Sequence, residues 1–328
     1  MHKKRSSALL GAAVILFALL LRLGGGITYA SSHSLRLAQP QNAFLRKVQS
    51  GVSRQELPLK PQPTVPLPTQ PVERPVFTAG DISLIRMRYA SGCKHRPDLE
   101  SLLQRSLAWD LAQNVPTVLI IHSHGTEAYT PTPGETYKDF GSYRTRDTAH
   151  NMVAVGEHLT KILEASGIRV IHDRTLHDDP SYNAAYTNSR KAVKNWLAQY
   201  PDIQLVIDLH RDAATEADGS QYATSAWVDG QAVAQLMLVM GSHSSSLPHP
   251  DWEDNLSVGL KLLVQLERMA PGITRTTTLG TSRYNQDLHP AMLLVEVGSA
   301  GNSLEQAKAA AEILGEAIIA LKLGANGK

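Results

Sequence analysis

The sequence contains very little cysteine and few aromatic residues. Cys93 is the single cysteine among 328 residues, which excludes an intramolecular disulfide framework and a cysteine-rich metal site. Aromatic residues make up 5% of the chain, too few to predict a stacking platform for nucleic-acid bases. A strong excess of one charge is also missing, because 32 Lys and Arg stand against 30 Asp and Glu. The resulting formal net charge of +2 gives no support to a nucleic-acid binder, which usually has a clustered basic excess.

Hydrophobic residues and histidines are plentiful by comparison. Hydrophobic residues make up 42% of the chain and charged residues 19%, which is typical of globular proteins. A length of 328 residues allows one or two ordinary domains. Thirteen histidines are present, and their positions carry most of the functional information in the sequence.

The N-terminal segment, residues 1–30, is predicted to be a membrane anchor or a signal segment. Basic residues at positions 3–5 precede an uncharged apolar run, Ala8–Leu21, and the small residue Ala30 fits a signal-peptide cleavage site. The same run, extended to Ala30, is long enough for an uncleaved anchor. Because Lys and Arg stay in the cytoplasm, we expect a single N-terminal span in the cell membrane and a domain on the extracytoplasmic side.

A proline-rich linker is predicted over residues 31–80. The stretch from Leu57 to Pro75 contains seven prolines in nineteen residues and is not compatible with a helix or a sheet. It is expected to form an extended polyproline-type spacer roughly 60 Å long, which sets the distance of the following domain from the membrane. The alternative is a PxxP ligand for a partner domain.

Residues 81–328 are predicted to form one α/β domain with a mostly parallel or mixed sheet flanked by helices. Short apolar or β-branched runs alternate with segments of helical periodicity, and glycine or proline separates them. The predicted strands are residues 118–121, 168–171, 203–209, 221–228, 233–240, 273–279 and 292–297. The predicted helices are residues 148–166, 184–199, 252–269 and 303–323.

Ionisable residues follow the ends of the three strongest predicted strands. The first of these strands runs into His122 and His124, the second into Asp208 and His210, and the last into Glu296. An unpaired charge at such a place costs several kcal/mol, roughly 2–7 by transfer data, so a merely structural role is unfavourable for all of them. Ligands bind beyond the carboxyl ends of strands in open α/β sheets. The three strand ends therefore predict one site.

Two histidines, several carboxylates and no usable cysteine are typical of a catalytic zinc site. Such a site keeps three protein ligands and leaves one position for water, with a nearby carboxylate as general base. His124 and His210 are the predicted histidine ligands. His122 lies within its strand and is expected to orient a ligand or to be structural. The loop that contains His172, Asp173, His177, Asp178 and Asp179 is a candidate to line the substrate groove.

Several segments closely resemble the stage II sporulation protein P family, membrane-anchored peptidoglycan hydrolases of endospore formers. The resemblance covers about residues 116–323. The N-terminal membrane segment and the proline-rich spacer also fit the family. It is carried by Pro116-Thr-Val-Leu-Ile-Ile-His-Ser-His-Gly-Thr-Glu-Ala-Tyr129, Asn151-Met-Val-Ala-Val-Gly156, His172-Asp173, Tyr182-Asn183 and Val206-Ile-Asp-Leu-His-Arg-Asp212.

The motifs are also similar, more distantly, to zinc-dependent N-acetylmuramoyl-L-alanine amidases. This likeness implies a zinc amidase-like fold, with His124 as the first ligand, His210 as the third and Glu296, in Leu294-Val-Glu-Val-Gly298, as the general base. The second ligand of that superfamily is a Glu four residues before a helix asparagine. Asp147 occupies this place before Asn151 and is the implied second ligand. The alternatives for that ligand are His150 and Glu127.

The resemblance implies a Zn2+-dependent hydrolase that cleaves the amide between N-acetylmuramic acid and L-alanine during engulfment in sporulation. Endopeptidase cleavage of stem peptides is a second activity of the family. Arg211 is predicted to bind a substrate carboxylate, with an ion pair to Asp212 or Asp208 as the alternative. Tyr182 and Tyr186 are candidates for contact with glycan or peptide, or for packing.

The family also implies partners and leaves two rival functions open. Peptidoglycan, the membrane and the stage II sporulation proteins D and M are the implied partners, and nucleic acid is not. The first rival is another zinc enzyme of the cell wall, a peptidase or a deacetylase. The second is a wall-binding scaffold without catalysis, against which Glu296 argues, because a structural metal site needs no additional carboxylate.

Overall fold

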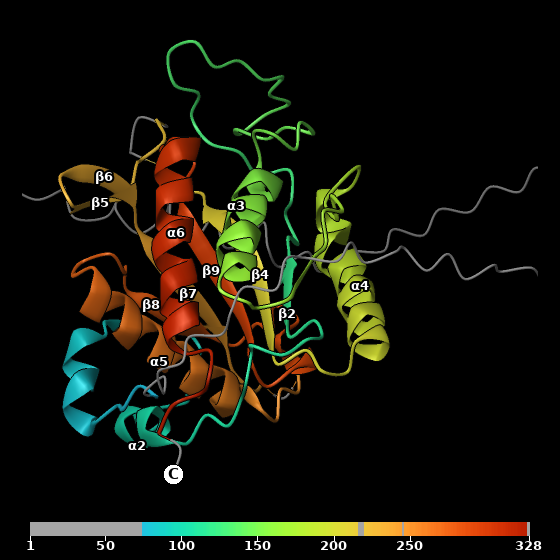
Figure 1. The fold of residues 1–328 in the computed structure, drawn as a ribbon. Coiled ribbons are helices and arrows are strands. Elements are labelled where there is room, and N and C mark those ends of the chain that lie inside the picture. The colour runs from blue at the N-terminus through green and yellow to red at the C-terminus, as the bar shows by residue number, and fades with distance from the viewer. Residues whose placement is uncertain (1–73, 216–219, 245, 327–328) are drawn as a thin grey trace, which may run out of the picture. The chain divides into compact units, whose positions relative to one another are not determined.

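A computed structural model describes residues 74–215, 220–244 and 246–326 of the chain (Figure 1). These residues all belong to one compact unit, Pro63–Lys328. The predicted membrane segment 1–30 and most of the predicted linker lie outside the described residues. Within the described ranges, no helix combines the length and the apolarity that crossing a membrane requires. The folded part includes residues before the predicted boundary at position 81, since Phe77 is buried and its N–H donates to Asn326 Oδ1 at 2.8 Å.

The described chain alternates strands and helices, as the sequence predicts. Its helices are η1 (Ala79–Leu84), α2 (Leu99–Gln104), α3 (Met152–Ala165), η2 (Tyr182–Ala184), α4 (Ala185–Gln199), α5 (Trp252–Met269), η3 (Gln286–Leu288) and α6 (Leu304–Ala320). Its strands are β1 (Met87–Tyr89), β2 (Val118–Ile121), β3 (Val170–His172), β4 (Leu205–Asp212), β5 (Ser225–Val228), β6 (Gln231–Ala234), β7 (Leu236–Gly241), β8 (Thr277–Gly280) and β9 (Met292–Ser299).

Seven strands form one sheet in the order β1-β8-β7-β9-β4-β2-β3. All neighbouring pairs are parallel except β7 and β9, which are antiparallel. The carboxyl ends of β2, β3, β4 and β9 therefore meet at one edge of the sheet, where β7, β8 and β1 begin. The prediction of a mostly parallel sheet flanked by helices is confirmed.

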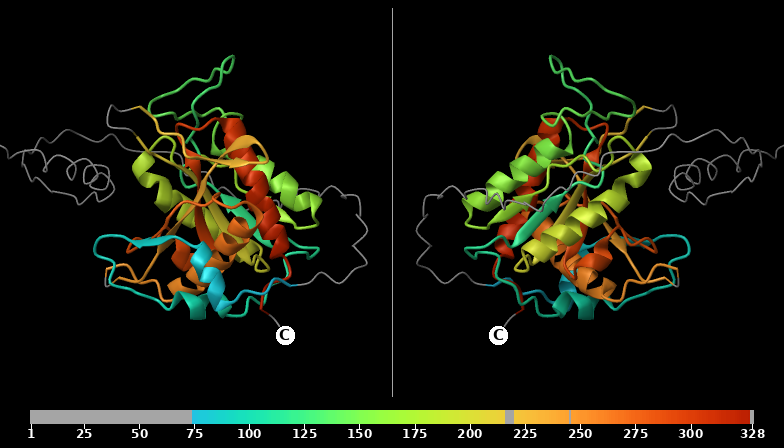
Figure 2. Two further views of the ribbon diagram at one scale, coloured as in Figure 1. Left: turned by 90° about the vertical axis from the view of Figure 1, so that its left-hand side faces the viewer. Right: turned by 90° about the vertical axis from the view of Figure 1, so that its right-hand side faces the viewer.

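Helices cover the two faces of this sheet unequally. The chain leaves β2 through α3 to reach β3 and returns through α4 to β4, so right-handed crossovers place these two helices on opposite faces. The views in Figure 2 show α4 on one side of the strands and α3 with α6 on the other. Gly259 of α5 lies against Leu238 and Met240 of β7, on the α3 and α6 side.

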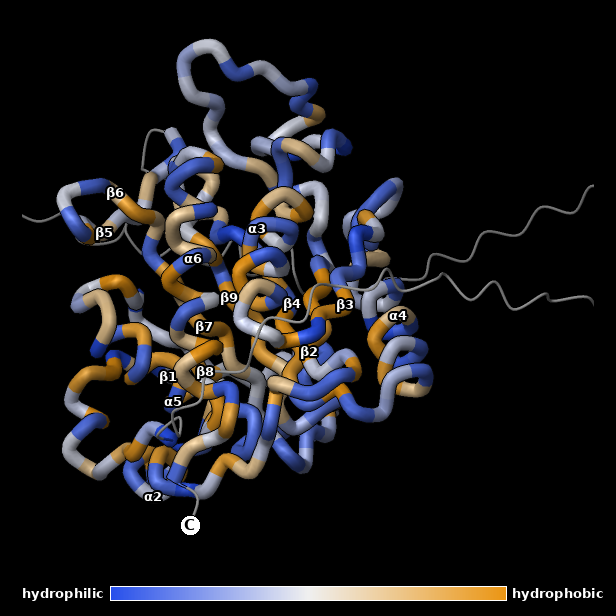
Figure 3. The backbone as a smooth tube through the Cα atoms, in the orientation of Figure 1, coloured by the Kyte–Doolittle hydropathy of each residue, from blue (hydrophilic) through white to orange (hydrophobic). Residues whose placement is uncertain are grey.

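Alternation along the strands divides the core into two clusters. In β4, Leu205, Ile207 and Leu209 belong to the large cluster under α3, α5 and α6. Val206 belongs to the smaller cluster under α4, together with Leu119 and Ile121 of β2. Side chains of a strand point alternately to the two faces, so Asp208 and His210 share the α4 side with Val206. Figure 3 shows the apolar character of the central strands and the more polar segments at the sheet edge.

Three details of the elements differ from the sequence prediction. Helix α3 begins at Met152 rather than at 148, because Asn151 is its N-cap and accepts a hydrogen bond from the N–H of Val153. The turn at Asp229-Gly230 does close a hairpin, β5–β6, but that hairpin ends at Ala234 and the chain enters the main sheet at Leu236. Strand β1 is three residues long, too short to show a periodicity in the sequence.

Candidate active site

Two strand ends bring His210 and Glu296 together. His210 of β4 and Glu296 of β9 are direct partners in the parallel register, so both side chains lie on the α4 face of the sheet. Both residues are buried. The sequence prediction that the ends of these strands meet at one edge is confirmed.

His124 reaches the same place from the loop after β2. The ring centroids of His124 and His210 are 5.4 Å apart, and the ring planes are nearly perpendicular at 78°. Both histidines are nearly inaccessible to solvent, with exposed fractions of 4% and 3%. The two predicted histidine ligands are therefore neighbours.

Glu127 is a buried carboxylate beside this pair. Its Oε2 lies 3.6 Å from His210 Nδ1 and accepts the backbone N–H of Arg211 at 3.2 Å. A tight turn, in which the N–H of Glu127 donates to the carbonyl of His124 at 3.1 Å, brings the side chain back toward the histidines. Burial raises the pKa of Glu127, but His210, Arg211 and His124 together lower it far below its ordinary range. Glu127 is therefore ionised at neutral pH.

Asp147, the second ligand implied by the distant likeness, lies elsewhere. Its carboxylate is half exposed to solvent and contacts His150 Nδ1 at 2.9 Å and the N–H of Ala149 at 3.0 Å. Within the described part of the chain, Asp147 and His150 form no hydrogen bond, ion pair or ring contact with His124 or His210. The geometry therefore favours Glu127 among the three candidates that the sequence left open.

Asp208 holds His210 from the side opposite Glu127. Its Oδ1 lies 3.0 Å from His210 Nε2, and its two oxygens accept hydrogen bonds from the N–H and the hydroxyl of Ser123 at 2.7 and 2.6 Å. Burial disfavours a charged His210, but Asp208 and Glu127 outweigh it and raise the pKa of His210 well above its ordinary value of 6.5. The sequence offered Asp208 only as an alternative ion-pair partner of Arg211, whereas the structure pairs it with His210 and Ser123.

His124 has its own carboxylate partner, Asp178. Asp178 Oδ2 lies 3.6 Å from His124 Nδ1 and accepts the hydroxyl of Thr126 at 2.6 Å. Arg144 also donates to this carboxylate. This loop therefore reaches the site through Asp178, whose contact with His124 was not predicted.

Two tyrosines form an aromatic wall beside the histidines. The ring of Tyr182 stacks on His124 with centroids 4.2 Å apart, and the guanidinium of Arg144 lies 4.5 Å from the Tyr182 centroid. Tyr186 meets His124 edge-on at 5.5 Å and lies nearly parallel to the His210 ring at 6.2 Å. Tyr182 is 41% exposed, so it is the member of this wall that an incoming ligand can touch.

Arg211 is buried and donates to the protein backbone. Its Nε donates to the carbonyl of Ala128 at 2.9 Å, and its Nη2 donates to the carbonyls of Ser142 and Tyr143 at 2.7 and 3.1 Å. Its Nη1 lies 3.9 Å from Glu127 Oε1. The alternative ion pair to Asp212 is not seen, because Asp212 pairs with Arg275. These partners tie the segment around residues 128–143, which extends past the sheet edge in Figure 1, to Glu127.

His122 lies on the other face of the sheet from His210. Its Nδ1 lies 3.2 Å from the carbonyl of Leu209, and its Nε2 lies 2.9 Å from Nε2 of His172. Gly156 of α3 packs against this pair so closely that a Cβ there would come within 2.6 Å of both Nε2 atoms. Burial lowers the pKa of His122 to about 4, so its ring is neutral and supports the end of β4 from behind.

The chemistry of the donor set fits a zinc ion. Two imidazoles and one ionised carboxylate form a known catalytic ligand set. His124 Nδ1 is buried, forms no hydrogen bond within 3.5 Å to any described residue, and faces Asp178 Oδ2 at 3.6 Å. Throughout residues 74–215, 220–244 and 246–326, however, no three His, Cys, Asp or Glu side chains are already spaced for a metal ion. In His210, the ring nitrogens face Asp208 and Glu127 instead.

Comparison with known proteins assigns the family. The family model of stage II sporulation protein P matches residues 68–319. The chain belongs to this family. Over 215 residues it is 32% identical to the stage II sporulation protein P of Bacillus subtilis strain 168, a region that covers 61% of this chain. The chain matches only 50% of the length of that relative.

Solved amidase structures are distant neighbours of this family member. An N-acetylmuramoyl-L-alanine amidase from Clostridium difficile 630 is 15% identical, with 63% of this chain and 94% of the other covered and a TM-score of 0.35. The amidase Ami1 from Mycobacterium abscessus is 14% identical, with coverages of 63% and 96% and a TM-score of 0.37. Likenesses at this distance do not assign an activity, so the function is argued from the site itself.

Proposed function

We propose that this member of the stage II sporulation protein P family hydrolyses peptidoglycan during engulfment in sporulation. The scissile bond is the amide between N-acetylmuramic acid and L-alanine, and cleavage within stem peptides is a second activity. One observation carries the proposal: His124, Glu127 and His210 converge beside Glu296, which is the direct partner of His210 in the register of β4 and β9. Two histidines, a carboxylate and a separate carboxylate are the parts that metal-assisted amide hydrolysis requires.

His124, Glu127 and His210 are the residues that would hold the metal. A zinc ion bound there supplies polarisation of the scissile carbonyl and a lowered pKa for water. Asp208 and Asp178 lie against His210 and His124 at 3.0 and 3.6 Å, which supports a role in orienting the two imidazole rings. Both carboxylates are themselves held by hydroxyl groups, those of Ser123 and Thr126.

Glu296 is the proposed general base. It is buried on the face that carries His210 and takes the proton of the attacking water, then returns it to the leaving amine. Arg211 acts as a positioning residue, because its N–H holds the Glu127 carboxylate while its guanidinium binds the carbonyls of Ala128, Ser142 and Tyr143. This role replaces direct binding of a substrate carboxylate, since those donors already have backbone partners.

The proposed place of action follows from the sequence outside the described residues. Residues 1–30 anchor the chain in the cell membrane, the proline-rich residues that follow act as a spacer, and the folded domain, which includes Phe77, works on the extracytoplasmic side. Peptidoglycan is the proposed substrate, and stage II sporulation proteins D and M are the proposed partners. Protease added to intact protoplasts should remove the domain, and protection of the domain would contradict this topology.

Mass spectrometry of products released from purified peptidoglycan tests the reaction. We expect free stem peptides that begin with L-alanine, loss of their release after chelation, and recovery when zinc is added. A new end within the stem peptide alone would identify a wall peptidase, and released acetate would identify a deacetylase. No new ends from zinc-loaded protein that binds the wall would identify a scaffold and contradict the proposal.

A further inference from the structure

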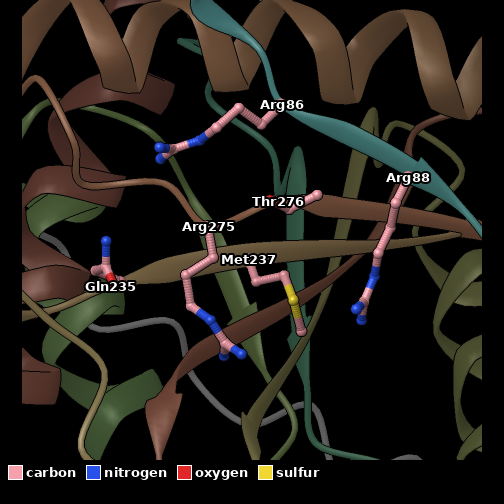
Figure 4. A pocket seen from close by; sticks show the side chains of 6 residues that line it. All are labelled: Arg86, Arg88, Gln235, Met237, Arg275 and Thr276. Atoms are coloured by element: carbon pink, nitrogen blue, oxygen red, sulfur yellow. The ribbon is translucent and has the colours of Figure 1, made fainter.

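Three arginines line a cavity of about 340 Å³ over β7, β8 and β1. Arg86 and Arg88 come from β1 and the residue before it, and Arg275 lies just before β8 (Figure 4). Gln235, Met237 and Thr276 complete the lining, so no carboxylate lines the cavity. The cavity is therefore a positively charged hollow whose polar groups are mainly hydrogen-bond donors.

The register of the sheet places this cavity on the face that carries the catalytic residues. Met237 of β7 is the direct antiparallel partner of Glu296, which is in turn the partner of His210. Two residues after Met237 in β7, Val239 pairs with Thr278 of β8, and Thr278 pairs with Arg88 of β1. Directly paired residues, and residues two apart in a strand, share a face. Arg88, Met237 and Glu296 therefore lie on one face.

The spacing of the strands gives the distance between the two sites. Strands β9, β7, β8 and β1 follow one another in the sheet. Neighbouring strands are about 4.8 Å apart, so the backbone of β1 lies roughly 14 Å from that of Glu296, and β8 roughly 10 Å. An extended peptide advances about 3.3 Å per residue, so three or four residues span the same distance.

The charges of this cluster are largely uncompensated within the described residues. Arg275 pairs with Asp212 at 2.8 Å, whereas Arg86 and Arg88 form no ion pair with any described carboxylate. Arg86 donates instead to the carbonyl of Thr274 at 2.6 Å and Arg88 to the hydroxyl of Thr278 at 2.7 Å. Each guanidinium has further donors, and a like-charged cluster with donors left over attracts an anion.

Glu267 contacts Thr274, whose carbonyl accepts the hydrogen bond from Arg86, but the carboxylate of Glu267 is already engaged. It accepts the N–H groups of Gly272 and Thr274, both at 2.8 Å, and the hydroxyl of Thr274. Glu267 therefore serves the turn before β8 and leaves the guanidinium groups of Arg86 and Arg88 available to a ligand.

We propose that Arg86, Arg88 and Arg275 form a subsite that binds a carboxylate of the stem peptide, three or four residues from the scissile amide. This proposal rests on the proposed function, because it takes the stem peptide as substrate. Stem peptides carry carboxylates at such distances from the muramic acid end, and a guanidinium binds a carboxylate through two parallel hydrogen bonds. The subsite fixes the direction in which the peptide leaves the scissile bond, across β9, β7 and β8 toward β1.

Kinetics on two matched substrates test the subsite with the full-length chain. One substrate is a muropeptide with free stem-peptide carboxylates, and the other is the same muropeptide with those carboxylates amidated. In the double variant Arg86→Met, Arg88→Met we expect kcat/KM on the free-carboxylate substrate to fall about tenfold, mainly through KM. On the amidated substrate the variant and the unmodified chain should be nearly equal. The double variant Arg86→Lys, Arg88→Lys should recover part of the loss.

Arg169→Met is the matched control. Arg169 directly precedes β3, at the opposite edge of the sheet, and this variant should behave like the unmodified chain on both substrates. Equal losses on both substrates, or no loss on either, would overturn the subsite while leaving the hydrolase intact.

A binding measurement separates failure of the subsite from failure of the proposed function. Isothermal titration with a free stem tetrapeptide should give binding that the double Met variant loses and that amidation of the peptide also removes. Such binding without any cleavage of muropeptides would keep the subsite and overturn the hydrolase. Cleavage by a chain whose peptide affinity does not depend on Arg86 and Arg88 would keep the hydrolase and overturn the subsite.

Discussion

The two faces of the central sheet have different compositions, although the same strands supply both. On the α3, α5 and α6 face, Leu205, Ile207 and Leu209 of β4 enter a continuous apolar cluster. On the α4 face, Val206 is followed by Asp208 and His210, both buried. Alternate side chains of β4 thus point to opposite faces: one set packs in the apolar core, and the other carries the polar residues of the candidate site.

The comparison shows why the α4 face can hold so many buried charges. Two buried carboxylates beside the histidines each have a cationic group and a hydroxyl nearby: Asp208 has His210 and Ser123, and Asp178 has Arg144 and Thr126. Such groups are costly when they lose a partner and nearly neutral when paired. The apolar face supplies the burial that stabilises the domain, and the α4 face holds the polar groups of the proposed active site in place.

Removing His210 should damage the α4 face most. His210→Ala takes away one proposed zinc ligand and leaves Asp208 and Glu127 facing each other without the imidazole between them. We expect zinc content and wall hydrolysis both to be lost, because two remaining ligands hold zinc poorly. Elemental analysis and a wall-hydrolysis assay measure the two effects. His158→Ala in α3 is the control, and a fully zinc-loaded His210→Ala would refute the assignment.

Glu296→Gln should separate the proposed general base from the proposed metal ligands on this same face. The variant keeps the shape of the side chain but removes its basicity, so hydrolysis should fall by about 10²–10⁴-fold. Zinc content should stay at the level of the unmodified chain. A zinc-free Glu296→Gln protein would show instead that Glu296 binds the metal.

A substitution that creates a cavity on the apolar face should lower the stability of the domain without changing the rate of hydrolysis. Leu314 of α6 is completely buried in the large cluster, so Leu314→Ala should reduce the free energy of unfolding by about 3 kcal/mol. The kcat of the remaining folded protein should be unchanged. Denaturant unfolding and single-temperature kinetics measure these quantities, and a loss of kcat larger than twofold, on the order of 0.4 kcal/mol, would argue against the separation of the two faces.

Lys261 is a buried charged residue on the otherwise apolar side. Its replacement should raise the free energy of unfolding, by less than Leu314→Ala lowers it. Its ammonium group is buried in α5 and donates to the carbonyl of Leu102 and the hydroxyl of Ser257, with no carboxylate partner among the described contacts. Burial, with a smaller contribution from Arg105, lowers the pKa of Lys261 from 10.5 to about 8. We expect Lys261→Met to raise the free energy of unfolding at pH 7 by about 1–3 kcal/mol.

The pH dependence of stability gives the matching control for Lys261. Between about pH 8 and pH 10.5 the unfolded chain still binds a proton that folded Lys261 has released. Stability should therefore rise with pH across this window, relative to the Lys261→Met variant, which lacks the group. Parallel pH profiles of the two proteins would contradict the lowered pKa.

The strand ends could be predicted from the sequence because they combine two strong local signals. An apolar run identifies the strand, and an ionisable residue at its carboxyl end has no structural use there, which is how His124, His210 and Glu296 were found together. Strands β4 and β9 continue past His210 and Glu296 to Asp212 and Ser299. The same reasoning could not rank Glu127 above Asp147. That choice depends on a backbone turn after His124, and a spacing rule taken from a distant superfamily does not contain this turn.

Contacts between loops were also outside the reach of the sequence. Asp178 meets His124, and Arg211 binds the carbonyls of Ser142 and Tyr143, through loop conformations that no periodicity encodes. The arginine cavity was missed for a related reason. Arg86 and Arg275 are 189 positions apart, and only the order of the strands brings them to one hollow.

The zinc content of Glu127→Gln and Asp147→Asn, purified side by side, tests the central assignment most directly. Glu127 lies beside both histidines, whereas Asp147 contacts His150 at the surface. The two substitutions should therefore have opposite effects on zinc content. We expect Asp147→Asn to retain near-stoichiometric zinc and wall hydrolysis, and Glu127→Gln to lose most of both. Full zinc in Glu127→Gln together with its loss from Asp147→Asn would contradict the site described for this protein.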